Sequence, residues 1–169
     1  PTAAAKIAGK IGNTTVGYIS AVDNKGPSIS NLDPAYVNVI RLKRDLSDQN
    51  HIGLVYTDRM HNDLSNRVIA ADGKFIKNDK YSFRAQSGFS VTNSNLESAE
   101  IAPMWNIAAN ASGRKWSSSF STTGYHSNFN PAVGFIQRGD YVTISAGPTR
   151  RFYGKKDAFL EQLSISYRL

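Results

Sequence analysis

The sequence predicts an all-β fold, an antiparallel up-and-down meander of about ten long strands in a single domain spanning residues 1–169. Apolar and polar residues alternate through most of the chain, as they do in strands with one apolar and one polar face. Clusters of Asn, Asp and Gly separate the alternating runs and mark hairpin turns. Ser, Thr and Asn together account for 42 of the 169 residues, which suits a sheet with one water-exposed face.

The expected strands follow one another closely along the chain. We place them near residues 3–11, 14–22, 35–44, 51–59, 67–77, 80–92, 103–112, 115–125, 140–153 and 158–169. Short turns close the hairpins at Gly12-Asn13, Asp45 to Asn50, Asn78-Asp79, Gly113-Arg114 and Gly154 to Asp157. Longer connections, at 23–34, 60–66, 93–102 and 126–139, join one hairpin to the next, so short and long connections alternate.

The clearest alternation lies in the runs 81–90 and 162–169, where aromatic and aliphatic residues share one face. The polar positions of these runs are Arg84, Gln86, Gln162, Ser164 and Ser166. The stretch 157–163 has some helical character, but the alternation after it favours a strand. Two faces are imperfect: Asn38 falls on an apolar face, and the strand near 67–77 has no clear inside and outside.

Composition limits the class of protein. A chain of 169 residues corresponds to one domain or to a piece of a larger one. The absence of cysteine excludes disulfides, thiolate metal sites and a cysteine nucleophile. No apolar stretch is long enough for a transmembrane helix, and the first residues lack a signal peptide and an initiator Met, so we expect a processed or excerpted chain.

The strand pattern favours a membrane barrel over a soluble sheet. Strands of roughly 9–11 residues match the thickness of a bilayer, whereas strands of soluble proteins are usually about 5–6 residues long. Short turns at one end and long loops at the other are typical of outer-membrane barrels. Aromatic residues expected at the ends of the apolar faces suit interfacial girdles: Tyr56, Tyr81, Phe89, Trp105, Trp116, Phe120, Tyr141, Phe159 and Tyr167.

Several stretches also carry a family resemblance. They are AAKIAGKIGN at 4–13 with VGYISAV at 16–22, YVNVIRLKRD at 36–45 with NHIGL at 50–54, and FNPAVGFIQRGDY at 129–141. These stretches resemble a Bacteroidota-type outer-membrane family in which a family-nine-like carbohydrate-binding module precedes a C-terminal β-barrel of unknown function. The resemblance implies that the chain is part of such a barrel, located in the bacterial outer membrane, since no carbohydrate-binding module is visible in it.

We expect the loop near 128–141 to pack against the rest of the chain and not to extend into solvent. It holds Pro131 and Gly134, which interrupt strand pairing, yet it also holds several apolar residues that are costly to expose. We expect Phe129 and Phe135 to fold back onto the barrel end or into its lumen. Arg138 and Asp140 are then candidates for an ion pair at the start of the next strand.

No catalytic or metal-binding constellation emerges. His51, His61 and His126 lack ligand spacing, and nothing in the sequence places the two carboxylates Asp72 and Glu161 together, as a glycosidase would need. The net charge of +7 comes from dispersed bases, which does not suggest nucleic-acid binding, although Arg or Lys lining a pore favours anions.

The sequence therefore predicts a non-enzymatic outer-membrane β-barrel, or a segment of one, with a scaffold or transport role. No cofactor is expected. The expected partners are outer-membrane lipid, the remaining strands of a larger barrel or other outer-membrane proteins. The alternative is a soluble β-sheet module that binds glycans by stacking on surface aromatic residues, namely Trp105, Trp116 and tyrosines.

Overall fold

The computed structural model describes residues 1–23, 34–62, 64–94, 97–136, 138–156 and 159–169, and its regular elements there are all strands. They are β1 (Ala3–Ile11), β2 (Thr14–Asp23), β3 (Ala35–Asp45), β4 (His51–His61), β5 (Leu64–Lys77), β6 (Tyr81–Ser94), β7 (Glu97–Ser112), β8 (Trp116–Tyr125), β9 (Tyr141–Tyr153) and β10 (Gln162–Ser166). Nowhere in these ranges is there a helix of the length and apolarity needed to cross a membrane.

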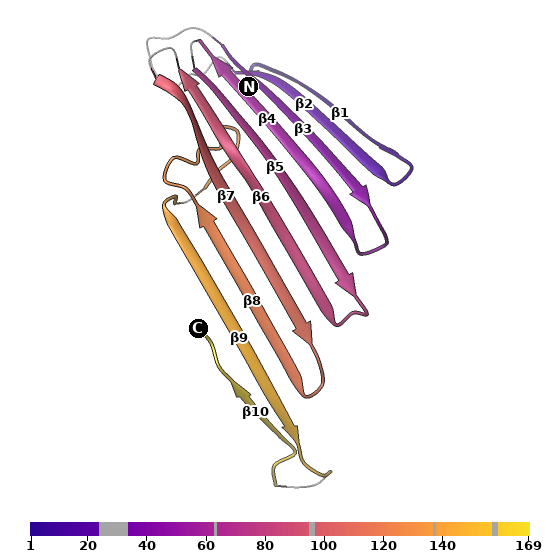
Figure 1. Cartoon of the computed structure of the whole chain (residues 1–169). Helices are drawn as coiled ribbons and strands as arrows, with labels where there is room; N and C mark the ends of the chain where they lie inside the picture. The colour runs from indigo at the N-terminus through magenta and orange to yellow at the C-terminus, as the bar shows by residue number, and fades with distance from the viewer. Residues whose placement is uncertain (24–33, 63, 95–96, 137, 157–158) are drawn as a thin grey trace.

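All ten strands form one sheet in which each strand pairs antiparallel with its neighbours in the chain (Figure 1). The order runs from β1 to β10 without a crossover, and the sheet is open, with β1 and β10 at its two edges. The prediction of an all-β up-and-down meander is confirmed.

Two of the expected long connections are wrong. Most of 60–66 and 93–102 belongs to strands, because β4 runs on to His61 and β7 begins at Glu97. These segments are rich in Asn, Ser, Asp and Glu and therefore resemble loops, but their backbones pair in register, as Ser65 does with Asn93. The expected connection 23–34 lies almost wholly outside the described residues. β10 is shorter than expected, because residues 159–161 still belong to the connection and the Gly154 amide closes that hairpin on the Glu161 carbonyl.

The register assigns every strand residue to one of two faces, since residues paired across strands point to the same side. One row pairs Ile40 with Tyr56, Tyr56 with Ile69, and Ile69 with Phe89. Following the register outward from this row gives the apolar face. Its large members include Ile7, Tyr18, Ile40, Leu42, Ile52, Leu54, Tyr56, Ile69, Phe75, Phe83, Phe89, Trp105, Ile107, Phe120, Ile144, Phe152, Leu163 and Ile165.

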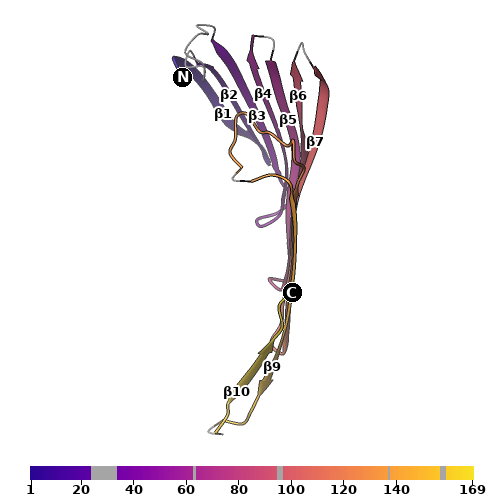
Figure 2. The ribbon, with the colours of Figure 1, turned by 90° about the vertical axis from the view of Figure 1, so that its left-hand side faces the viewer.

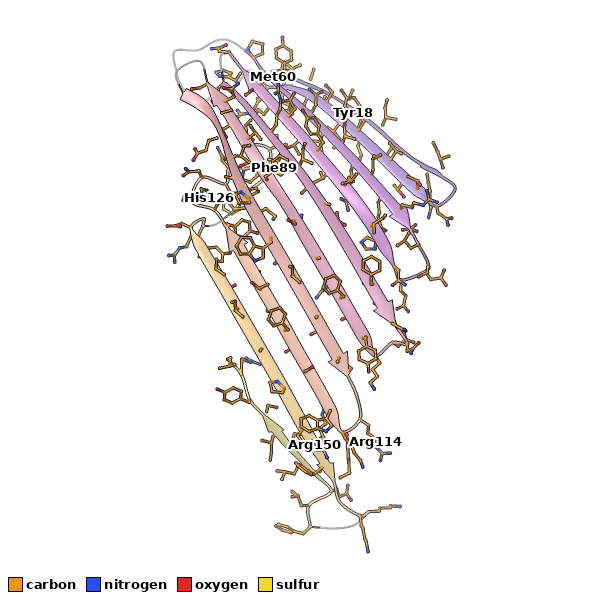
Figure 3. All side chains as sticks on the ribbon, in the orientation of Figure 1. Tyr18, Met60, Phe89, Arg114, His126 and Arg150 are labelled. Atoms are coloured by element: carbon orange, nitrogen blue, oxygen red, sulfur yellow. The ribbon has the colours of Figure 1, made fainter. Side chains whose placement is uncertain are left out.

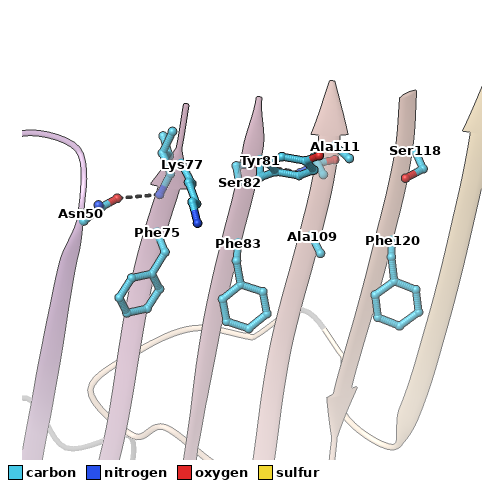
Figure 4. A pocket seen from close by; sticks show the side chains of 12 residues that line it. Asn50, Phe75, Lys77, Tyr81, Ser82, Phe83, Ala109, Ala111, Ser118 and Phe120 are labelled. Carbon is cyan, nitrogen blue, oxygen red and sulfur yellow. Dashed lines mark hydrogen bonds between the residues drawn. The ribbon is translucent and has the colours of Figure 1, made fainter. Parts of the chain in front are cut away.

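Rings stand side by side on this apolar face. Phe75 of β5 and Phe83 of β6 are direct partners, and Phe120 of β8 lies at the same level beyond the small Ala109 of β7 (Figure 4). The side chain of Asn50, just before the start of β4, accepts a hydrogen bond from the Ile76 amide (Figure 4).

Two pairs of polar residues on the apolar face are hydrogen-bonded to each other. The Tyr18 hydroxyl donates to Oδ1 of Asn38 over 2.9 Å, and Nε of Arg67 donates to Oδ1 of Asp58 over 3.2 Å. Both pairs lie toward the end of the sheet opposite the turns at Gly12-Asn13, Asp45 to Asn50 and Asn78-Asp79. Two expected girdle residues are misplaced. Phe159 lies in the connection before β10 and not on a strand. Tyr141 pairs with Tyr125, and both lie on the opposite, polar face, with ring centroids 5.5 Å apart.

The sheet is curved and its strands are staggered. Figure 2 shows β1 to β3 bending to one side, and the orange loop between β8 and β9 lies on that same side. His51, the first residue of β4, pairs with Lys74, yet β5 continues for three more residues to Lys77. The short turns therefore descend stepwise from β1 to β10 (Figure 1), and strands staggered in this way are tilted relative to the axis of a barrel.

Candidate functional site on the polar face

The face opposite the apolar one is mainly hydroxyl, amide and charged, and we call it the polar face. The register places there Lys10, Thr15, Arg41, Lys43, His51, Asn66, Asp72, Lys74, Arg84, Gln86, Asn106, Ser121, Thr123, Gln162, Ser164 and Ser166. All five polar residues that the sequence singled out in the runs 81–90 and 162–169 lie on it. The polar face is also the side that the loop between β8 and β9 covers.

Phe129 fixes this loop to the polar face. Its side chain is only 6% exposed, and it packs with Val68 of β5 and with Ala102 and Met104 of β7. The ring of Tyr125 lies 5.7 Å from the Phe129 ring, centroid to centroid. This small cluster is the main buried apolar cluster of the described residues, and it lies where the loop packs on β5 and β7.

Asn66 of β5, which is 3% exposed, holds the backbone of the loop beside Phe129. Its Nδ2 donates to the carbonyl oxygen of Asn130 over 2.8 Å and to the Thr92 hydroxyl over 2.9 Å. Its Oδ1 accepts from the Ala132 amide over 3.0 Å. The amide side chain is thus satisfied as both donor and acceptor, and buried polar groups in this state hold a single geometry.

Ser90 of β6 adds a further anchor. It is 1% exposed, and its Oγ accepts a hydrogen bond from the Asn130 amide over 3.1 Å. Asn66 and Ser90 therefore bind both backbone groups of one loop residue. The anchors come from β5 and β6, which precede the loop by more than thirty residues in the chain.

The expected packing of this loop is right for Phe129 and wrong for Phe135, which is 84% exposed. A turn closed by the Gly134 amide on the Pro131 carbonyl reverses the chain between them, and Ile136 rather than Phe135 returns to the buried cluster. Arg138 and Asp140 are both exposed and make no ion pair with each other or with any other described residue.

A hollow of about 390 Å³ lies between the loop and the sheet. Val39, Val55, Ala70 and Gln86 contribute to its floor, and the loop contributes Phe129, Val133 and Ile136 to its roof. The loop thus stands off the sheet in part and does not lie flat against it.

A charged network lies on the polar face between β1 and β5. Both terminal nitrogens of Arg41 donate to the carboxylate of Asp72, and Nε2 of His51 lies 3.9 Å from the same carboxylate. The guanidinium occupies the space over Gly53, where a Cβ atom would lie 2.6 Å from Nη2 of Arg41. The ends of β1 and β3 are joined by Asp45, which pairs with Lys10 over 2.8 Å and with Lys43 over 3.1 Å.

Unlike the charged residues of that network, Lys74 and Arg84 have no oppositely charged partner among the described residues. They are direct cross-strand partners on β5 and β6, so two like charges face each other, an arrangement that costs stability. No carboxylate of a described residue lies within ion-pair distance of either. On the polar face, Lys74 pairs with His51 of β4, and Gln86 lies two residues beyond Arg84 on β6. Sequence reasoning missed this pair, because only the register brings the two residues together.

The residues weighed for catalysis do not come together. Asp72 of β5 is bound by Arg41 of β3, while Glu161 lies in the connection between β9 and β10. Within the described ranges, no group of three His, Asp or Glu side chains is placed to hold a metal ion.

Comparisons with known proteins add no identity. No family model matches the chain, no curated protein matches it, and no solved structure matches it. The resemblance to an outer-membrane family therefore stays a prediction.

Proposed function

We propose that this chain forms part of the wall of an outer-membrane-type β-barrel, with its apolar face against lipid and its polar face lining a hydrated lumen. One observation carries the proposal: large apolar side chains form a continuous exposed face across all the strands, while the residues beside them in sequence form a polar face. Soluble monomers rarely expose an apolar surface of this extent. In an outer-membrane barrel it is the expected surface.

Strand length and loop position support the same proposal. β1 to β9 are each at least nine residues long, sufficient for a tilted strand to cross a bilayer. The loop between β8 and β9 is anchored on the polar side, where it would narrow a lumen. The role is that of a scaffold or a pore in the bacterial outer membrane, without catalysis.

The two open edges imply a partner. Within a bilayer, an unpaired strand edge leaves backbone N–H and C=O groups without hydrogen bonds, which is not tolerated. β1 and β10 would therefore pair with further strands of the same barrel or with other outer-membrane proteins.

Single-cysteine labelling tests the proposal directly, because the natural chain has no cysteine. Thr143 and Ile144 are neighbours on β9 that lie on opposite faces and are both exposed. We would replace each with Cys, attach a polarity-sensitive fluorophore and reconstitute the chain in phosphatidylcholine vesicles. The label at 144 should be quenched by nitroxide on lipid tails, and the label at 143 by aqueous iodide.

Equal aqueous quenching at both positions, or failure to associate with vesicles, would overturn the membrane proposal. The glycan-binding alternative would then be tested with immobilised glycans and a Trp116→Ala variant. The environment of Trp105 argues against that alternative: its ring covers Gly124 and its indole N–H donates to the Thr122 hydroxyl over 3.3 Å, so it is committed to the sheet.

A further inference from the structure

One end of the sheet carries the turns Asn78-Asp79 and Gly113-Arg114 and the connection from Gly154 to Glu161, and we call it the short-turn end. Cations and aromatic rings lie together there. Arg150 is the most developed case. It lies on the apolar face, paired with Trp116 of β8 and Ile165 of β10, and its guanidinium carbon is 4.6 Å from the Trp116 ring centroid and 5.3 Å from that of Phe152. The charge is therefore held between two rings.

Similar pairs occur at the neighbouring connections. The guanidinium carbon of Arg114 lies 5.1 Å from the Tyr153 ring centroid, and Nζ of Lys80 lies 5.2 Å from that of Tyr81. Figure 3 shows Arg114 and Arg150 together at this end of the sheet, far from Met60 and Phe89.

The turn that carries Arg114 is fixed in place by β9. Nη1 of Arg151 donates to the Gly113 carbonyl over 3.2 Å, and the Tyr153 hydroxyl donates to the Arg114 carbonyl over 2.9 Å. Arg114 and Arg150 are thus presented from a well-connected corner, and neither has an ion-pair partner among the described residues.

We propose that Arg150 and Arg114, with the rings of Trp116, Phe152 and Tyr153, form a binding site for the phosphate of an anionic membrane lipid. This inference rests on the proposed membrane position of the apolar face. Stacking leaves the N–H edge of a guanidinium free, and that planar fork matches phosphate oxygens in a bidentate manner. Aromatic residues favour the level of the headgroups, where such a phosphate lies.

The charge at this end explains why the lipid should be anionic. Besides Arg114 and Arg150, the described residues at the short-turn end include the cations Lys77, Lys80, Lys115, Arg151, Lys155 and Lys156 against the carboxylates Asp79 and Glu161, so cations are in excess. A zwitterionic headgroup would bring its own ammonium among these cations, whereas phosphatidylglycerol brings a net negative charge. Each basic residue near an anionic surface favours binding by about fivefold.

Electron paramagnetic resonance with spin-labelled lipids provides the test. The protein is reconstituted in phosphatidylcholine vesicles with spin-labelled phosphatidylglycerol or phosphatidylcholine, and the immobilised fraction of each is measured. We expect a severalfold preference for phosphatidylglycerol that decreases at high salt and falls by about fivefold in Arg150→Gln. Arg59→Gln, which removes the same charge on the polar face toward the other end, should retain the wild-type preference.

Arg114→Gln, a substitution in a turn, serves as a second variant if Arg150→Gln does not give a wild-type circular dichroism spectrum. Equal immobilisation of both lipids by the wild-type protein, or equal effects of Arg59→Gln and the site variants, would overturn the inference and leave the membrane proposal intact. A wild-type chain that immobilises neither lipid would overturn both.

Discussion

Asn66 of β5 donates a 2.8 Å hydrogen bond to the carbonyl of Asn130, which lies 64 residues later in the chain. The same side chain accepts a hydrogen bond from the Ala132 amide. One side-chain amide therefore binds the backbone of the loop between β8 and β9 on both sides of Pro131. The loop is thereby bound to the polar face through its backbone groups, in addition to the Ser90 hydrogen bond and the buried Phe129 ring.

Replacing Asn66 with Ala should loosen this loop. The Asn130 carbonyl and the Ala132 amide would lose their partner, at a cost of about 1–3 kcal/mol. Trypsin cleavage after Arg138, measured on the folded protein, should accelerate by roughly five- to a hundredfold if cleavage follows local opening. Asn106→Ala is the matched control, since Asn106 bonds Thr123 on the same face and not the loop. Equal cleavage rates in the two variants would contradict the anchoring role.

The two phenylalanines of the loop should behave oppositely. Phe129→Ala removes a ring buried against Val68 and Met104, which should lower the free energy of unfolding by about 3 kcal/mol. Phe135→Ala removes an exposed ring and should change it by less than about 0.5 kcal/mol. Denaturant unfolding in detergent micelles, followed by tryptophan fluorescence, measures both. A larger loss for Phe135→Ala would show that the loop is packed differently.

Gly124 should not tolerate a side chain. A Cβ atom there would lie 2.2 Å from the Trp105 ring, so Gly124→Ala must displace the indole, at a cost of about 1–3 kcal/mol. The emission maximum of the protein should shift as well. Gly9→Ala is the control, because a Cβ atom at Gly9 meets no atom within 4 Å. Wild-type stability and emission for Gly124→Ala would refute the close contact.

Removing one of the opposed cations should stabilise the sheet. Lys74→Gln or Arg84→Gln relieves a like-charge pair and should raise the free energy of unfolding by about 0.2–1 kcal/mol at low salt. Lys43→Gln, which breaks the pair with Asp45, should not raise it. The gain should shrink in high salt because of screening. A stability loss at position 74 or 84 would indicate that the two cations have an unrecognised partner.

The same substitutions should reduce anion preference if the polar face lines a pore. Reversal potentials across planar bilayers with a salt gradient measure the anion-to-cation permeability ratio. A unit charge near a permeating ion in water interacts with it by about 1 kcal/mol, which corresponds to about fivefold in permeability. Each removed charge should therefore lower the anion-to-cation ratio by up to about fivefold. Cation preference in the wild-type protein would contradict this role for Lys74 and Arg84. So would an unchanged permeability ratio in the variant that combines Lys74→Gln and Arg84→Gln.

Alternation predicted the ten strands and the faces of the clearest runs, but not the face of β5 or the full lengths of β4 and β7. The positions of Arg84, Gln86, Ser164 and Ser166 on one polar surface follow from period two alone. Asn38 was also predicted on the apolar side, but its partner Tyr18 was not, because cross-strand partners depend on register. For the same reason the opposition of Lys74 and Arg84 could not be predicted.

The errors have a common physical cause. Polar residues such as Ser65 and Asn66 resemble a loop in composition, yet their backbones pair in the sheet. In the loop itself, composition indicated that apolar residues would be buried. Which of them is buried depends on the turn between Pro131 and Gly134, a property of backbone geometry that apolar content does not encode.

The chain-neighbour order of the strands has a consequence for the kinetics of assembly. Each pairing joins consecutive strands, so no step of sheet formation has to bring distant parts of the chain together. The hairpins can therefore form rapidly and independently. Docking of Phe129 and Asn130 on β5, β6 and β7 is different, because it requires the four strands β5 to β8 to be in place. Refolding should accordingly show an early phase in which β-structure forms and a later phase in which the loop becomes protected from protease.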